Sequence, residues 1–220
     1  MKKYSALILI FLLNGLSAQY ITLSKAIKTS DNKDRFFYRI DPATANAEYL
    51  GEVEVQGFSN NDAETFRQIY NKAKTIGANS FALRKSENLD GQITFNPAHY
   101  FLDLYYTADI PRQENLIYVI SSASKPQNIK FNNKTVTLLP RTYVRHALTE
   151  GLSLSVGRLL GSKITLSPKQ NQPEQYFQVV PAGIRADQSG PGGLNLKSGD
   201  IILLEKSYAG FLTTIYQEHQ

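Results

Sequence analysis

The chain has 220 residues, with 24 Lys and Arg against 19 Asp and Glu, and it contains no cysteine and no tryptophan. The formal net charge of +5 is mild, and no run of five basic residues occurs, so we expect no nucleic-acid partner. The lack of cysteine excludes disulfides and the lipid-modified cysteine of bacterial-type lipoproteins. We therefore expect a fold stabilised by core burial alone, with no lipid anchor. The 13 Tyr and 11 Phe residues favour β-sheet.

The first 18 residues predict a cleaved secretory signal peptide. Lys2 and Lys3 form a basic start, residues 6–13 form an apolar run, and Ala18 places a small residue at a cleavage point before Gln19. The apolar run is shorter than the roughly 20 residues that a transmembrane helix needs. The alternative is a buried N-terminal helix. The pattern predicts export to a periplasm or to the outside of the cell, with no transmembrane segment in the chain.

Residues 19–109 predict a domain with a helix packed on an antiparallel sheet, in the order βαββ. A capping sequence at residues 59–62 precedes a helix that ends before Gly77, a residue suited to the turn after a helix. The apolar stripe of this helix is expected to consist of Ala63, Phe66, Ile69, Tyr70, Ala73 and Ile76.

Strands are expected on both sides of this helix. Residues 49–56 alternate, which predicts one buried face with Tyr49, Gly51, Val53 and Val55 and one polar face with Leu50, Glu52, Glu54 and Gln56. Residues 80–84 and 99–107 are further strands, and the apolar density of the latter predicts burial on both faces. Residues 36–40 are a possible additional strand, and residues 88–92 resemble a hairpin turn.

Residues 110–115 are polar, include a proline, and are expected to be a linker to a second domain at residues 116–220. Short apolar segments separated by Gly and Pro predict a β-sandwich or barrel there. The expected strands are residues 116–120, 129–131, 135–139, 143–148, 152–156, 163–166, 175–180 and 201–204. Apolar residues at helical spacing after Tyr208 predict a short terminal helix. The fold class is therefore α+β, a βαββ domain followed by an all-β sandwich domain.

Two segments of the first domain carry a family resemblance. Residues 49–55 read YLGEVEV, and residues 72–80, at the end of the helix, read KAKTIGANS. Together they resemble the heavy-metal-binding βαββ domains of cell-envelope proteins, a family that includes outer-membrane stress-sensor lipoproteins. The resemblance implies the βαββ fold and raises the question of a metal. The cysteines and lipid anchor of the stress-sensor members have no counterpart here.

The second half is similar to the prealbumin-like β-sandwich domains of exported proteins. The similar segments are residues 116–120, 136–143 and 150–154, and Arg141 and Glu150 stand where that family commonly has glycine and proline. Because these families mostly lack a known activity, the resemblance implies a fold rather than a function.

The patterns of potential metal ligands and nucleophiles do not indicate a metal or catalytic site. A metal site needs three or four converging ligands, and His99, His146 and His219 lie in different segments without a paired spacing. His99 and Asp103 are too far apart along an ideal strand to share an ion, so ordinary strand positions are the favoured interpretation. The sequence predicts no metal, no cofactor and no catalytic residue.

Two weaker hypotheses remain beside that prediction. Ser153 with His146 could form part of a hydrolase triad, although the second glycine of a nucleophile elbow is missing. Glu52 and Glu54 are roughly 7 Å apart on one strand face, a spacing of interest for glycosidic chemistry. Solvated strand faces are the favoured interpretation of both.

A glycine-rich stretch near the end of the chain is the candidate for partner binding. Its residues are Gly190, Pro191, Gly192 and Gly193. They lack the lysine and serine of a phosphate-binding P-loop, but binding residues concentrate on loops.

The leading hypothesis is a non-enzymatic exported protein that acts as a binding or envelope-interaction module. The expected partner is an envelope protein or a second copy of the chain. An envelope hydrolase or metal-dependent enzyme is the alternative, and a sandwich that carries a small apolar or sugar ligand is a third possibility.

Overall fold

A computed structural model describes residues 19–84, 94–110, 112–157, 161–181, 183–186, 194–197 and 199–219. The predicted signal peptide, the turn at residues 88–92 and the candidate loop at Gly190–Gly193 lie outside the described residues. The described part is mostly β-strand in several sheets and has two helices. It divides into two compact units with a boundary between Asp109 and Ile110. Among the described residues, no helix is long and apolar enough to cross a membrane.

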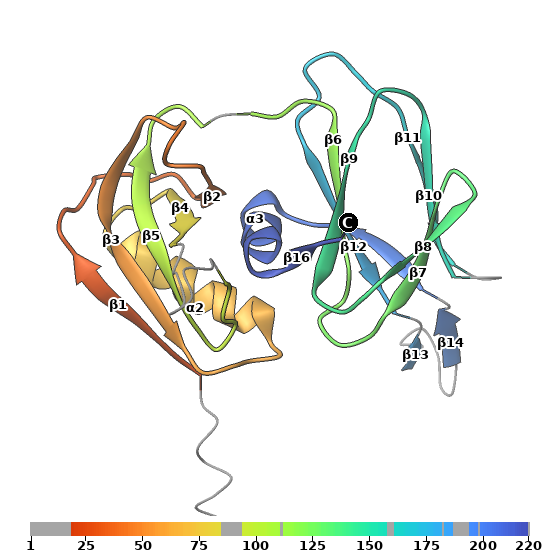
Figure 1. The fold of residues 1–220 in the computed structure, drawn as a ribbon, viewed down its shortest axis with the longest axis horizontal. Coiled ribbons are helices and arrows are strands. Elements are labelled where there is room, and N and C mark those ends of the chain that lie inside the picture. The colour runs from red at the N-terminus through yellow and green to blue at the C-terminus, as the bar shows by residue number, and fades with distance from the viewer. Residues whose placement is uncertain are drawn as a thin grey trace, which may run out of the picture. The chain divides into compact units, whose positions relative to one another are not determined.

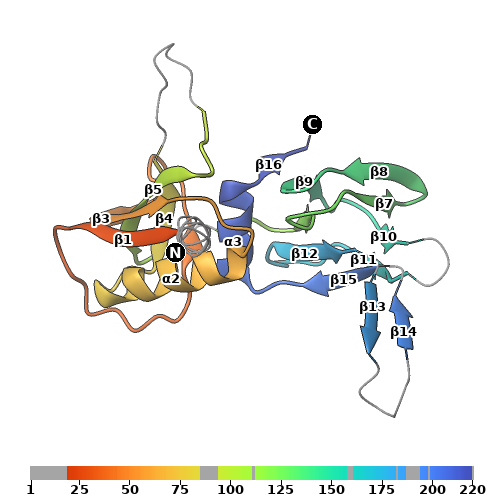
Figure 2. The same cartoon turned by 90° about the horizontal axis from the view of Figure 1, so that it is seen from below.

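The first unit is a five-stranded sheet with one helix on one of its faces (Figures 1 and 2). The strand order is β1-β3-β5-β4-β2. Its elements are β1 (Tyr20–Ala26), β2 (Tyr38–Arg39), β3 (Ala47–Gln56), α2 (Asp62–Thr75), β4 (Ser80–Leu83) and β5 (His99–Thr107). The prediction of an antiparallel sheet was wrong at one edge, since β2 pairs in parallel with β4. Strand β1 was not predicted, and it pairs with β3.

The helix α2 begins and ends where the sequence predicts. The Asn61 side chain accepts a hydrogen bond from the Glu64 backbone N–H at 3.1 Å, which satisfies one free donor of the first turn. At the other end Gly77 has φ +75°, and a Cβ there would lie 1.8 Å from the Ser30 carbonyl oxygen. The predicted stripe was partly wrong, because Ala63 is exposed. The buried positions are Asp62, Thr65, Ile69, Ala73 and Ile76.

Replacing Asn61 with alanine is expected to lower the free energy of unfolding by about 1 kcal/mol, since the Glu64 N–H loses its acceptor. Asn60→Ala is the matched control, because Asn60 is exposed and caps nothing. Urea denaturation followed by circular dichroism measures both. Equal losses in the two variants would contradict the role of the cap.

A β-bulge in β3 changes which side chains share a face of the sheet. Tyr49 lies opposite Tyr105 and Gly51 lies opposite Leu104, so Leu50 is the extra residue. The predicted alternation was therefore wrong before the bulge: Leu50 is fully buried, and Tyr49 lies on the same face as Glu52. The Tyr49 hydroxyl donates to Glu52 Oε2 at 3.4 Å.

The central strand β5 is buried on one face only, which corrects the prediction of burial on both. Tyr100, Leu102 and Leu104 are buried, whereas Phe101, Asp103 and Tyr105 on the opposite face are half-buried. We call this second face the polar face; it also carries Tyr49, Glu52 and Glu54 from β3.

The second unit contains two larger sheets, which Figure 1 shows as separate layers. The four-stranded sheet has the order β11-β10-β7-β8, and the five-stranded sheet has the order β15-β12-β6-β9-β16. The four-stranded sheet consists of β7 (Gln127–Phe131), β8 (Lys134–Leu138), β10 (Leu152–Val156) and β11 (Lys163–Leu166). The five-stranded sheet consists of β6 (Leu116–Ile120), β9 (Thr142–Ala147), β12 (Gln175–Val180), β15 (Asp200–Leu203) and β16 (Gln217–Glu218). A short pair, β13 (Gly183–Ala186) and β14 (Leu194–Lys197), completes the strands.

One hydrophobic core holds these two sheets together. Buried residues from both sheets contribute: Ile117, Val119, Ile129, Leu138, Leu148, Leu152, Leu154, Val156, Phe177 and Val179. The predicted hairpin between β7 and β8 is confirmed, and Asn132 and Asn133 both have positive φ, as a two-residue turn of this kind requires. Arg141 also adopts the left-handed region, with φ 57°.

The end of the chain is built into the five-stranded sheet of the second unit. The predicted terminal helix is confirmed as α3 (Lys206–Ile215), which packs against β12 and β16. Glu205 caps it by accepting from the Ser207 and Tyr208 backbone N–H groups. Strand β16 then pairs in parallel with β9. The segment predicted as a linker ends in hydrogen bonds of this unit, since the Asn115 N–H donates to Gln172 O at 2.8 Å.

Candidate functional site

Charged side chains gather on the polar face of the first unit. Arg84, just after β4, donates to Glu52 Oε2 at 2.5 Å and also to the Asp103 carboxylate. Glu52 and Asp103 lie directly opposite each other on β3 and β5. The guanidinium therefore bridges two carboxylates that would otherwise repel each other.

This arrangement holds Glu52 in its ionised form. The hydrogen bond from Arg84 is the main cause that lowers the pKa of Glu52, and a hydrogen bond from Ser24 adds to it. Burial raises the pKa of Tyr49, and the negative charge of Asp103 raises it further. In this cluster the Arg84 guanidinium pairs with both carboxylates, and the Tyr49 phenol lies beside them. Such a network stabilises the surface of a sheet.

Replacing Arg84 with methionine is expected to lower the free energy of unfolding by about 1–2 kcal/mol at pH 7. This value lies between those typical of exposed and of buried ion pairs. Because the folded pKa of Glu52 is below its unfolded value, its contribution is present above about pH 4.3 and is lost as pH falls through the folded pKa. The free energy of unfolding of the original protein should therefore fall more steeply between pH 5 and pH 3 than that of the variant. Urea denaturation across this range, with the exposed Arg112→Met as control, measures the slopes. Equal slopes in Arg84→Met and the original protein would contradict the assignment.

The hypotheses of paired carboxylates and of a metal are not supported by the positions of these residues. Glu54 accepts from Gln56 and contacts His99 Nε2 at 2.8 Å, and the Gln56 hydrogen bond is the main cause that lowers the pKa of Glu54. Glycosidic chemistry needs one carboxyl with a raised pKa to act as the acid, and the pKa values of both Glu52 and Glu54 are lowered. His99 and Asp103 have separate partners. Within the described ranges, no group of three or more His, Asp or Glu residues could hold a metal ion.

Ser153 and His146 lie in different sheets of the second unit, and no hydrogen bond joins them in the described part of the chain. The Ser153 N–H donates to Asn132 Oδ1 at 2.7 Å, and the Ser153 carbonyl oxygen accepts from the Asn132 N–H at 2.8 Å. His146 stacks on Phe131 with ring centroids 6.0 Å apart. Their positions are those of strand residues at one end of the unit.

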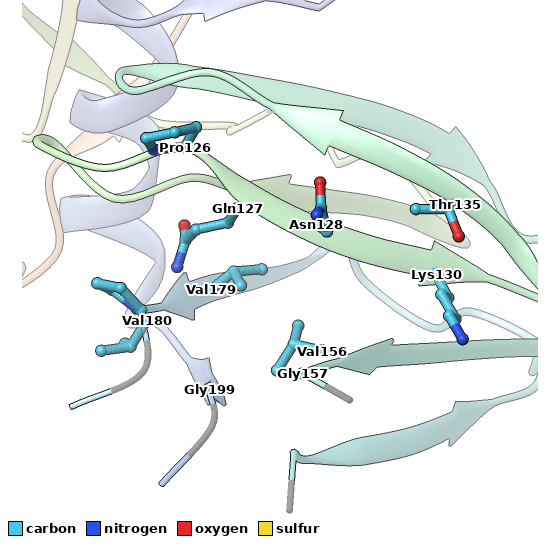
Figure 3. Close-up of a pocket in the computed structure, with 11 residues that line it drawn as sticks. Pro126, Gln127, Asn128, Lys130, Thr135, Val156, Gly157, Val179, Val180 and Gly199 are labelled. Atoms are coloured by element: carbon cyan, nitrogen blue, oxygen red, sulfur yellow. The ribbon is translucent and has the colours of Figure 1, made fainter. Parts of the chain in front are cut away.

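The second unit holds a cavity of about 540 Å³, which we call the end cavity (Figure 3). Its described lining is Pro126, Gln127, Asn128, Lys130, Thr135, Val156, Gly157, Val179, Val180, Pro181 and Gly199. The cause is a difference in strand length: β10 ends at Val156, opposite Ile129, so Gln127 and Asn128 at the start of β7 have no strand partner on that side among the described residues. At this unpaired start of β7 the cavity opens to the surface of the unit. The volume lies in the range typical of small-molecule sites.

Gln127 is the most informative side chain of the end cavity. It is 8% exposed, and Figure 3 shows it directed toward the end of β12, where Val179 and Val180 lie. Its Oε1 accepts from the Ser122 backbone N–H at 2.9 Å, which fixes the orientation of the amide. Its Nε2 is buried and has no hydrogen-bond partner among the described residues. Leaving such a donor unmet costs about 1–3 kcal/mol, so this amide favours an acceptor oxygen in the cavity.

More polar groups lie at the opening of the end cavity, and they are exposed. Lys130 extends from β7 (Figure 3), and it pairs with Thr135 on one neighbouring strand and with Ser155 on the other. Asn128 Oδ1 accepts from the Thr137 hydroxyl at 2.7 Å, so its Nδ2 faces away from that bond. The described lining contains no carboxylate.

This site was not predicted from the sequence, because its residues come from five separate segments. The predicted strand began at Ile129, two residues late, so Gln127 was not assigned to a strand face. The available signal was the alternation of Gln127, Ile129 and Phe131, which places an amide on an apolar face.

Comparison with protein families, with curated proteins and with solved structures finds no match to this chain.

Proposed function

We propose that this protein is exported and that its second unit, a β-sandwich, is a non-enzymatic module that binds a small molecule in the end cavity. The observation that carries the proposal is the end cavity itself, of about 540 Å³, whose lining includes Gln127 with a buried Nε2 that has no acceptor among the described residues. Export is supported by the signal-peptide pattern of residues 1–18.

The lining specifies a general kind of ligand. Five of its residues, Pro126, Val156, Val179, Val180 and Pro181, offer apolar surface. A ligand with an apolar body gains by leaving water, and one acceptor oxygen can pair with Gln127. This favours a mainly apolar molecule that carries a carbonyl, ether or hydroxyl oxygen.

The test is binding of Prodan, a neutral naphthalene ketone whose fluorescence reports its surroundings. Val180→Trp should weaken binding by about tenfold or more, since the indole fills space in the cavity. Leu203→Trp is the matched control, because Leu203 lies on the adjacent strand β15, is 64% exposed and does not line the cavity. Circular dichroism melting of both variants verifies their folding. A folded Val180→Trp variant that binds Prodan as well as the original protein would overturn the proposal, as would a lack of binding by the original protein.

A further inference from the structure

We infer that the preferred ligand of the end cavity is an amphiphilic carboxylic acid, with its apolar part inside and its carboxylate at the opening beside Lys130 and Asn128. This inference rests on the proposed function and adds the charge of the ligand to it. It follows from the polar groups of the lining, because these groups offer mainly hydrogen-bond donors to a ligand.

The oxygens of the lining amides each already accept one hydrogen bond. Gln127 Oε1 accepts from the Ser122 N–H, and Asn128 Oδ1 accepts from the Thr137 hydroxyl. Gln127 Nε2 is buried at the cavity lining with no acceptor among the described residues, and the exposed Asn128, whose amide orientation is set by the Thr137 hydroxyl, lies at the opening. Two amides fixed in this way select for oxygen acceptors and against donors.

Lys130 supplies the positive charge, and its neighbours do not neutralise it. Its cross-strand partners are Ser155 and Thr135, neither of which is charged. Asp200 follows the lining residue Gly199 in the chain, but its Oδ1 accepts from the Ser162 hydroxyl at 2.5 Å and from the Ile201 N–H. Asp200 does not line the cavity, and Lys130 is the only charged residue of the described lining.

An anion at this opening gains both charge and hydrogen bonds. Hydrogen bonds from a lysine to a carboxylate are stronger than those between neutral groups. The valines and prolines farther in need an apolar substituent of the same molecule to cover them. A free small anion pairs with Lys130 but leaves the apolar lining uncovered, and a neutral apolar molecule covers the lining but leaves Lys130 unpaired by the ligand. An amphiphilic acid does both.

The experiment compares three ten-carbon ligands by isothermal titration calorimetry, below their micelle concentrations: decanoate, decanol and decyltrimethylammonium. Decanoate is expected to bind about tenfold more tightly than decanol, and the cation should bind most weakly. Lys130→Glu should remove the preference for decanoate. Lys134→Glu is the matched control, because Lys134 is an exposed lysine on the adjacent strand that does not line the cavity, and it should change the affinity for decanoate less than twofold.

Two results separate the failure of the inference from the failure of the proposed function. If Prodan and decanol bind but decanoate binds no better, or if Lys130→Glu keeps the preference for decanoate, the inferred carboxylate is wrong and the binding site remains. If neither Prodan nor any of the ten-carbon ligands binds, the proposed function fails as well. Gln127→Glu gives a second measurement: it keeps an acceptor for Ser122 but replaces the donor with a negative oxygen, and it should weaken decanoate binding more than decanol binding.

Discussion

Replacement of Gly51 with alanine is expected to destabilise the first unit by about 3 kcal/mol or more, because it forces an atom into the neighbouring strand. A Cβ on Gly51 would lie 2.2 Å from the carbonyl oxygen of Lys25 and 3.2 Å from the Ala26 Cα. These are backbone atoms of β1, so they cannot move aside as the end of a flexible side chain could. The change must separate β1 from β3 or distort the bulge next to Gly51.

Gly151→Ala is the matched control for this prediction. A Cβ at Gly151 meets no atom within 4 Å, so the same chemical change should have little effect or should stabilise slightly by restricting the unfolded chain. Urea denaturation followed by circular dichroism gives the free energy of unfolding for both variants. A loss below about 0.5 kcal/mol in Gly51→Ala would show that the close approach of the two strands is wrong.

Replacement of Leu154 with alanine is expected to lower the free energy of unfolding of the second unit by about 2–5 kcal/mol. Leu154 is fully buried in the core shared by the two sheets. Its cross-strand partners are Phe131 on β7 and Ile164 on β11. The loss combines the transfer of the removed carbons with the cavity that remains. Leu139→Ala is the control, because Leu139 is 57% exposed and the same truncation there should cost well under 1 kcal/mol. Similar losses in the two variants would contradict the assignment of Leu154 to the core.

The features that the sequence predicted well are local ones. The helix α2 was found from a cap, a periodic stripe and a glycine within one stretch, and the β7–β8 hairpin was found from two short strands around Asn132 and Asn133. In each case the interacting residues are close in the chain. Strands such as β10 and β12, with turn signals at both ends, were found with the bounds that the structure has.

The features that were missed depend on pairing between distant segments. Strand β1 has little alternation of its own and is held by β3, with a register shift after Leu23. An additional strand was predicted at residues 36–40, but only Tyr38 and Arg39 form a strand, because only they pair with β4. The bulge at Leu50 is a property of the register with β5, and one extra residue moved Tyr49 to the polar face. A single-sequence pattern contains the period of a strand but not its register.

The candidate site shows the same limit more strongly. The end cavity exists because β10 stops before β7 does, a difference that only the paired strands reveal. Gln127 is an ordinary residue in the sequence, and it becomes informative because the fold buries its amide and leaves Nε2 without a described partner. The candidates predicted from the sequence were residue types such as histidines and paired glutamates. In the structure His99 contacts Glu54, and Glu52 accepts a hydrogen bond from Arg84.

The order of strands in the five-stranded sheet of the second unit has a consequence for synthesis of the chain. Strands β6 and β9 can pair as soon as both have left the ribosome, but β6 receives its second neighbour only from β12, and β9 receives its own from β16. The segment between β6 and β12 contains all four strands of the other sheet. A nascent chain therefore presents the edge of β6, the apolar segment Leu116–Ile120, until β12 emerges, and the edge of β9 until β16 emerges. Such edges are templates for association with other chains, so this strand order makes the incomplete unit more prone to association than the finished one.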